Sequence, residues 1–265
     1  MARIGLIGMG NMGYAILKGL LQIQKPEEMI FTAAHQEKME QVSAQTGVAF
    51  ATSNRALAEQ VKYVILAVKP QYFDEVFADI KDVLRPDQVV ISLAPGVTIA
   101  SLNERLGESL RIVRAMPNTP ALLGEGMTGV CWENGRYSED EERELTELFT
   151  SFGQMQKVEE RQMDAVGCVS GSSPAFIYMM IEALADGGVK YGLPRAAALK
   201  MAAQTVLGSA KMVLETGKHP EQLKDEVCSP GGTTIQGVSA LERAGFRSAV
   251  IEACDACYEK STKIK

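Results

Sequence analysis

A mostly parallel, doubly wound α/β domain followed by an all-helical domain is the fold class that this sequence predicts. Short apolar runs alternate with helix-like patterns over residues 1–159, as they do in a chain of β-α units. From about Glu160 the strand-like runs disappear, and Ala, Met, Leu and Gly recur at helical spacings. Because this second half, residues 160–265, is too apolar all round for the surface of a monomer, we expect it to pack against a copy of itself in a homodimer.

The first apolar run, Arg3–Ile7, is followed at once by Gly8-Met9-Gly10-Asn11-Met12-Gly13 and then by a helical pattern. A G-x-G-x-x-G between a strand and a helix is the context that the dinucleotide-binding Rossmann fold requires. The first glycine allows the turn, the second lets the backbone approach a pyrophosphate, and the third lets helix and strand pack closely. The alternative is a β–α turn that binds no ligand.

The second predicted strand, Met29–Thr32, ends at Ala33-Ala34-His35. A site that prefers NAD usually has an Asp or Glu at this strand end, where it holds the ribose 2′-hydroxyl. No carboxylate at the strand end would repel a 2′-phosphate here. We therefore expect NADP(H) to be the preferred cofactor, with NAD(H) also used.

Three later apolar runs end in small residues or prolines. The runs Tyr63–Val68, Gln88–Leu93 and Arg111–Met116 stop at Lys69-Pro70, at Ala94-Pro95-Gly96 and at Pro117-Asn118. Ligands of open α/β sheets bind beyond the carboxyl ends of the strands. We therefore expect these strand ends to line one crevice together with the Gly8 loop.

The rest of the chain contributes strands, helices and buried apolar residues. A strand over Thr128–Trp132, a helix over Ser138–Ser151 and an edge strand over Gln154–Val158 complete the first half. In the second half, Ser170–Pro174 interrupts the helical pattern, and another helix spans Ala196–Glu215. We expect four methionines to fill the core: Met179, Met180, Met201 and Met212.

Composition and charge exclude several classes of partner. The net charge of −6 gives no reason to expect nucleic acid or an acidic membrane surface. No apolar run approaches the ~20 residues that span a bilayer, and the first residues do not form a signal peptide. The five cysteines suggest no disulfide framework, and we expect Cys254 and Cys257 to be buried thiols rather than metal ligands. The sequence therefore predicts a cytoplasmic protein without a metal site.

A second backbone anion site is predicted near the C-terminus, where Ser229-Pro230-Gly231-Gly232-Thr233-Thr234 precedes a helix-compatible run over Ile235–Arg243. Gly231 and Gly232 leave backbone N–H groups uncovered, and Thr233 and Thr234 add hydroxyls beside the positive end of the helix dipole. Such a loop suits a carboxylate or a phosphate. The alternative is an ordinary helix N-cap after a Pro-Gly turn.

Taken together, these motifs resemble those of the pyrroline-5-carboxylate reductase family over essentially the whole chain. The stretches that carry the resemblance are Ile7–Met12, Ala67–Pro70, Met116–Pro120, Ser170–Ala175, Ala185–Lys190 and Val227–Ile235. The resemblance implies hydride transfer from NAD(P)H to the C=N carbon of 1-pyrroline-5-carboxylate, which gives L-proline. It also implies a homodimer through the helical domain, and rings of dimers are known within the family.

The resemblance also implies roles for particular residues. Gly8, Met9, Gly10, Asn11 and Met12, after Ile7, would hold the pyrophosphate, while Ala34, His35 and Asn54 would meet the adenosine ribose. The nicotinamide half would lie by Val68, Lys69, Pro70, Ala94, Pro95 and Gly96. The substrate carboxylate would be held by Ser229, Gly231, Gly232, Thr233 and Thr234, with Thr234 also near the imine nitrogen as the catalytic residue. Relatives often carry Ser or Arg where this chain has Ala33-Ala34, which bears on the strength of the NADPH preference.

Two other functions compete with this one. A 3-hydroxyacid dehydrogenase or another cyclic imine reductase could share the two-domain plan, but such hydroxyacid enzymes typically use a lysine on the interdomain helix, and Ser170–Ala185 contains none. A nucleotide-sensing protein could have kept the glycine loop and lost its chemistry, but the intact Ser229–Thr234 loop argues against that.

Overall fold

The computed structural model describes residues 3–263, which form two compact units. The first unit contains the chain up to Ser172 and the segment from Cys257 on, and the second contains Ser173–Ala256. The sequence places the boundary at residue 159, where the composition changes. The structural division falls later because Met163 and Val166, in the first turns of the helical half, still pack against the core of the sheet.

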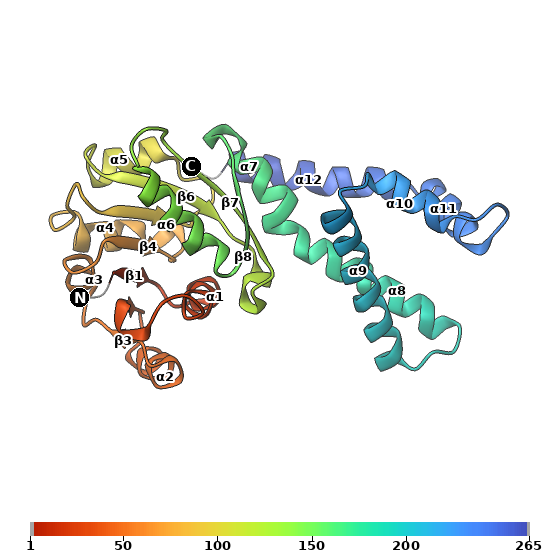
Figure 1. The fold of residues 1–265 in the computed structure, drawn as a ribbon, viewed down its shortest axis with the longest axis horizontal. Coiled ribbons are helices and arrows are strands. Elements are labelled where there is room, and N and C mark those ends of the chain that lie inside the picture. The colour runs from red at the N-terminus through yellow and green to blue at the C-terminus, as the bar shows by residue number, and fades with distance from the viewer. Residues whose placement is uncertain (1–2, 264–265) are drawn as a thin grey trace. The chain divides into compact units, whose positions relative to one another are not determined.

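The first unit is built on one eight-stranded sheet with the strand order β3-β2-β1-β4-β5-β6-β7-β8 (Figure 1). Its neighbours pair in parallel except β6 and β7, which are antiparallel. The strands are β1 (Ile4–Ile7), β2 (Met29–Thr32), β3 (Ala49–Phe50), β4 (Tyr63–Leu66), β5 (Val89–Ser92), β6 (Arg111–Met116), β7 (Gly126–Trp132) and β8 (Gly153–Lys157). The predicted α/β fold class is confirmed, and β8 is the predicted edge strand.

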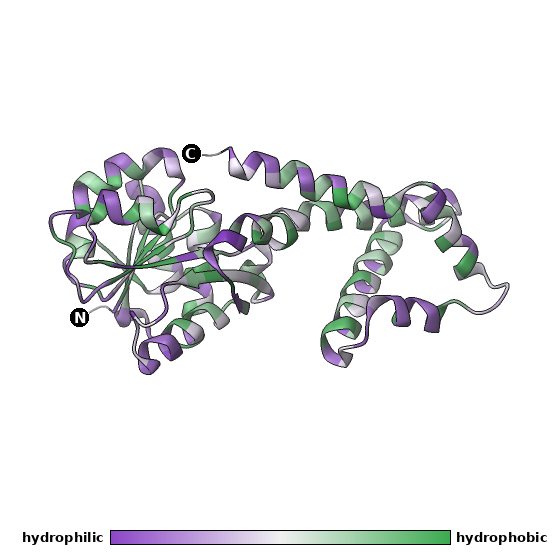
Figure 2. Ribbon diagram, turned by 90° about the horizontal axis from the view of Figure 1, so that it is seen from above, coloured by the Kyte–Doolittle hydropathy of each residue, from purple (hydrophilic) through white to green (hydrophobic). Residues whose placement is uncertain are grey.

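Helices cover both faces of this sheet, so that the buried strands are apolar on both sides. One face packs against α1 (Asn11–Leu20), α2 (Gln36–Thr46) and α6 (Glu139–Thr150). The other packs against α3 (Asn54–Ala58), α4 (Phe73–Ile80), α5 (Ile99–Leu106) and α7 (Met163–Val166). Short 3₁₀ turns, which include η2 (Pro70–Tyr72) and η3 (Thr119–Leu123), join some of these elements. The strands lie at the hydrophobic centre of this arrangement (Figure 2).

The second unit is entirely helical. Its elements are α8 (Ser173–Lys190), α9 (Arg195–Thr216), α10 (Pro220–Val227), α11 (Thr233–Arg243) and α12 (Phe246–Thr262), of which the last turns belong to the first unit. Its buried core is a cluster of three alanines, Ala185, Ala198 and Ala202. So small a core cannot by itself hold a domain of this length together.

The predicted interruption at Ser170–Pro174 coincides with a change of helix type: a π-helical segment covers Gly167–Ser172, and α8 begins at Ser173 with Pro174 in its first turn, as expected. The chain is not broken there, since the helical segment runs on through it. Pro174 has no N–H to donate to the carbonyl of Ser170, four residues earlier. That carbonyl instead accepts a hydrogen bond of 3.0 Å from the Asn118 side-chain amide. An external donor thus satisfies the carbonyl for which the proline has no N–H.

The predicted burial of the methionines and of the C-terminal cysteines is not found within one chain. Met179 is 69% exposed and Met201 is 57% exposed, and Met212 is also exposed. Cys254 and Cys257 are half-buried. The helices of this unit display hydrophobic stretches along much of their length (Figure 2). These side chains face outward because the unit has too little of its own chain to cover them.

A continuous helical segment over Glu160–Lys190 is long and apolar enough to cross a membrane by length and composition alone. The expectation that no segment approaches that length therefore does not hold by this measure. Few of the residues in its apolar window are buried.

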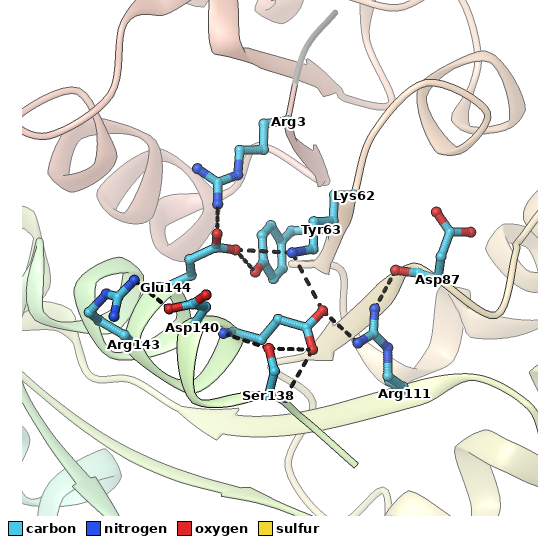
Figure 3. A network of polar contacts seen from close by, with 10 residues as sticks. Arg3, Lys62, Tyr63, Asp87, Arg111, Ser138, Asp140, Arg143 and Glu144 are labelled. Atoms are coloured by element: carbon cyan, nitrogen blue, oxygen red, sulfur yellow. Dashed lines mark hydrogen bonds and ion pairs between the residues drawn. The ribbon is translucent and has the colours of Figure 1, made fainter.

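A polar network at the amino edge of the sheet joins the strands to α6 (Figure 3). The Glu144 carboxylate accepts hydrogen bonds from Arg3, from the Tyr63 hydroxyl and, at 3.1 Å, from Lys62. Burial alone would raise the pKa of Glu144, but these three donors outweigh it and lower the pKa to about 2. One turn earlier on the same helix, the Glu141 carboxylate forms an ion pair of 2.6 Å with Arg111. The network fixes α6 to the edge opposite the glycine loop.

We expect Glu144→Gln to lower the stability of the protein at pH 7 by about 1–2 kcal/mol, a value reduced from the full pKa shift for partial exposure. The folded pKa of Glu144 lies below its ordinary value of 4.5. The stabilisation is therefore complete above about pH 5 and is lost as the pH falls toward 2. Calorimetric melting temperatures at one protein concentration should differ at pH 7 and converge at low pH.

Glu147→Gln is the matched control, since Glu147 lies on the same helix and makes no ion pair within residues 3–263. Equal melting temperatures for the two variants at pH 7 would contradict the proposed contribution of the network.

Candidate active site

The glycine loop joins β1 to α1 and has the geometry of a phosphate cradle. Gly8 has a φ of +102°, and a Cβ there would lie 2.7 Å from Val68 Cγ1. A Cβ at Gly13 would lie 2.2 Å from the Gly8 carbonyl oxygen. Both positions therefore require glycine, one for the turn and one for the approach of helix to strand. Gly10, in contrast, has nothing within 4 Å of the place where its Cβ would be.

The open space at Gly10 lies at the N-terminus of α1. Gly10 is the N-cap, and no side chain caps the helix there. The first backbone N–H groups of α1 are therefore left for a ligand, beside the positive end of the helix dipole. This arrangement fits the pyrophosphate of a dinucleotide.

A cleft of about 420 Å³ extends from this loop along the carboxyl edge of the sheet. It brings together most of the residues predicted for the cofactor: Ile7, Gly8, Met9, Gly10, Ala34, His35, Asn54, Val68 and Lys69. Asn11, Met12, Pro70, Ala94, Pro95 and Gly96 are not among the described residues that line it. Ala94 is 5% exposed, so its side chain is packed into the core at the end of β5.

The cleft also includes residues that no motif indicated. Tyr72, Glu75 and Val76 line it from the start of α4, at spacings of three and four residues that share one helical face. Sequence reasoning could have found them, because the turn after Lys69-Pro70 must begin at the carboxyl edge of β4. Thr32, Ala33, Lys38 and Ala67 complete the lining.

The adenosine-ribose corner predicted from the end of β2 is held by a chain of hydrogen bonds. The Thr32 hydroxyl donates to Asn54 Oδ1 at 2.7 Å, and Asn54 Nδ2 donates to Asp79 Oδ2 at 3.0 Å. Lys38 Nζ lies 5.7 Å from the centre of the Tyr14 ring. Lys38 is the one cation of α2 that lines the cleft, and no carboxylate stands at the end of β2.

The second predicted cradle, in the helical unit, forms a compact turn before α11. The Gly232 N–H donates to the Ser229 carbonyl at 3.1 Å, and Gly231 has a φ of +72°. Gly232 is the N-cap of α11, with no side-chain cap, and Thr233 and Thr234 are the first two helical residues. Both threonines and Ser229 are exposed. The turn therefore presents backbone N–H groups and hydroxyls together, as an anion site requires.

Within residues 3–263 no group of His, Cys, Asp and Glu side chains is arranged to hold a metal ion.

Comparison with known proteins identifies both halves of the chain. Residues 160–264 match the model of the family described as pyrroline-5-carboxylate reductase dimerisation, and residues 3–96 match that of NADP oxidoreductase coenzyme F420-dependent. The first match contains the long apolar helix and the exposed methionines, so these residues belong to a region that the family uses for dimerisation.

Relatives named pyrroline-5-carboxylate reductase match nearly the whole chain. The protein from Escherichia coli (strain K12) is 46% identical over 265 residues, covering 99% of this chain and 98% of its own. That from Methanosarcina acetivorans is 41% identical over 264 residues, covering 99% and 97%.

Solved structures of pyrroline-5-carboxylate reductases are also similar to this chain. A pyrroline-5-carboxylate reductase from Coxiella burnetii has a TM-score of 0.91 at 35% identity and covers 99% of this chain and 98% of its own. The pyrroline carboxylate reductase of Plasmodium falciparum with NADP bound has a TM-score of 0.88 at 33% identity, covering 98% and 97%. This chain, with its glycine-loop cleft and its helical dimerisation domain, belongs to the pyrroline-5-carboxylate reductase family.

Proposed function

We propose that this protein reduces 1-pyrroline-5-carboxylate to L-proline with NAD(P)H. The observation that carries the proposal is the 46% identity, over nearly the whole chain, to an enzyme named for that substrate. The open space at Gly10 and the uncapped N-terminus of α1 support the binding of a dinucleotide.

In this proposal the glycine loop holds the cofactor from one side. The backbone N–H groups at the start of α1, after Gly8, Met9 and Gly10, are proposed to bind the pyrophosphate. Asn54, Ala34 and His35, which line the same cleft, are proposed to meet the adenosine ribose. Lys69, Ala94 and Gly96, with their neighbours Val68, Pro70 and Pro95, are assigned to the nicotinamide half. When bound, NAD(P)H supplies a hydride to the imine carbon.

The Ser229–Thr234 loop is proposed to hold the substrate. Its backbone N–H groups and the hydroxyls of Ser229 and Thr233 bind the carboxylate, which keeps the small ring from rotating. Thr234 also contacts the ring nitrogen. As the imine carbon gains a hydrogen, the C=N double bond becomes a single bond, and the electron pair stays on nitrogen. A substrate protonated beforehand yields the secondary amine without a strong acid, so orientation contributes most of the acceleration.

The proposed preference for NADPH makes a direct prediction. Ala34→Asp places a carboxylate at the corner where the 2′-phosphate would lie, and repulsion should raise the KM for NADPH by about tenfold or more. The KM for NADH should change by less than threefold. Steady-state kinetics with both cofactors check this, with Ala34→Asn as the uncharged control of similar size. An equal rise for both cofactors would show that the change is steric.

We also propose that the homodimer formed by the helical domain assembles further into a ring of dimers, and that the enzyme is cytoplasmic. Sedimentation equilibrium of the full chain gives the number of subunits directly.

The decisive experiment is an assay of NADPH and NADH oxidation with synthetic 1-pyrroline-5-carboxylate, on protein of known mass in solution. Turnover that forms L-proline supports the proposal. Oxidation with hydroxyisobutyrate-type acids, or with other cyclic imines but not this one, would reassign the enzyme, and binding of NADPH without any turnover would indicate a sensing role.

A further inference from the structure

We propose that Asp79 is a positioning residue of the cofactor site, where it fixes the orientation of the Asn54 side-chain amide. The inference rests on the proposed binding of NAD(P)H in the cleft that Asn54 lines. Asp79 itself is not among the described residues that line this cleft. It acts through Asn54 and not on the cofactor.

One series of hydrogen bonds connects the glycine loop to Asp79. The Gly8 N–H donates to the Thr32 carbonyl at 3.0 Å, and the Thr32 hydroxyl donates to Asn54 Oδ1 at 2.7 Å. Asn54 Nδ2 then donates to Asp79 Oδ2 at 3.0 Å. Thr32 is only 4% exposed, whereas Asp79, at the other end of the series, is exposed. The series joins the loop, β2, α3 and α4 around one side of the cleft.

Asp79 decides which way the Asn54 amide faces. An asparagine amide has a donor end and an acceptor end of nearly equal shape, and its neighbours determine which end faces which. The Thr32 hydroxyl can donate or accept, so it would tolerate either orientation. An ionised carboxylate can only accept, so the NH₂ group must face Asp79. The oxygen must then face Thr32.

This orientation determines what Asn54 offers a ligand. One amide proton is directed at Asp79, which leaves the other as the donor available to a ribose hydroxyl or a phosphate oxygen in the cleft. If the amide were free to flip, the acceptor oxygen would face an anionic ligand for part of the time. Binding of the adenosine half would then weaken.

The stability of α4 does not explain why an acid stands at position 79. Asp79 is in the last turn of α4, where a negative charge is opposed by the helix dipole. Within residues 3–263 no lysine, arginine or histidine forms an ion pair with it. Replacement of Asp79 by asparagine would therefore leave a merely structural role intact. The same replacement would abolish the positioning role.

Calorimetric titration of the full-length protein with NADPH and with NADH tests the inference. We expect Asp79→Asn to raise both Kd values by about 3–10-fold, the size of one lost hydrogen-bond preference. Loss of a negative charge near a polyanion would alone have the opposite effect, so the direction is diagnostic. Asp82→Asn removes the same charge three residues later, from a side chain with no hydrogen bond or ion pair in the described chain, and should change Kd less than twofold. The melting temperature of Asp79→Asn should be equal to that of the wild type or higher.

A double-mutant cycle separates positioning from other effects. In an Asn54→Ala background, adding Asp79→Asn should change either Kd by less than twofold. Unchanged or lower Kd values for Asp79→Asn, or the same loss with and without Asn54, would overturn the inference. A wild type that binds both cofactors but does not reduce 1-pyrroline-5-carboxylate would reject the proposed activity alone, because these Kd values do not depend on turnover. A wild type that binds neither cofactor would overturn both.

Discussion

Gly10→Ala should leave the protein folded and raise the Kd for NADPH by about 10–100-fold. The φ of Gly10 is −75°, which any residue adopts, and no atom lies within 4 Å of the added Cβ. The substitution should therefore not lower the stability of the fold. The methyl group occupies the space through which a pyrophosphate would approach the first turn of α1, and overpacking of this kind costs about 1–3 kcal/mol. Titration with NADPH and a thermal melt measure the two effects separately.

Gly8→Ala is the comparison variant, because it should lower the stability of the protein, which Gly10→Ala should not do. Its φ of +102° and the contact of 2.7 Å with Val68 predict a loss of stability, whatever happens to cofactor binding. Gly10→Ala should instead melt within about 1 °C of the wild type, since it introduces no clash in the free protein. Normal NADPH binding by a folded Gly10→Ala variant would remove the glycine loop from the proposed cofactor site.

Thr234→Ala should lower kcat/KM for 1-pyrroline-5-carboxylate by more than tenfold, about 1.4 kcal/mol or more of transition-state binding. Thr234 is exposed at the start of α11, beside uncapped N–H groups, where its hydroxyl can hold a ligand without serving the fold. Within residues 3–263 that hydroxyl has no hydrogen bond to another side chain or to the backbone. The melting temperature should therefore change little.

Thr234→Ser and Thr150→Ala are suitable controls. Serine keeps the hydroxyl and should recover most of the lost activity, while Thr150 is an exposed helical threonine of α6 whose loss should not affect kinetics. The Kd for NADPH should be the same in all three variants, because the proposed role of Thr234 is toward the substrate. Near-wild-type kinetics for Thr234→Ala would exclude that role.

Local sequence patterns were sufficient to predict many elements of the first unit. The bounds of β2 and β6 are those predicted, because a short apolar run between turn residues has few other structures available to it. The glycine loop is similarly local, since its function depends on neighbouring residues of one strand, one turn and one helix. β3 and α5 were not predicted, and β3 is only two residues long, which is too short to give a periodic signal.

Contacts between distant segments were harder to predict. The Ser170–Pro174 stretch has the composition of a helix break, but the helix continues as a π-helical segment, and the Ser170 carbonyl accepts a hydrogen bond from Asn118, far away in the sequence. The methionines of α8 and α9 have the spacing of core residues, but a single chain does not bury them. The hydrogen-bond donor to Ser170 lies far away in the chain, and the methionines are not covered by their own chain. A local sequence pattern can indicate neither of these facts.

The sequence by itself determined most of the strands of the first unit, the glycine loop and the Ser229–Thr234 turn, because each depends on a few consecutive residues and their backbone preferences. Only the tertiary structure showed that Asp79 is bonded to Asn54. The physical reason is that a hydrogen bond between side chains depends on the packing of whole elements. Asn54 and Asp79 are 25 residues apart in the chain, and only the packing of α3 beside α4 brings their side chains together.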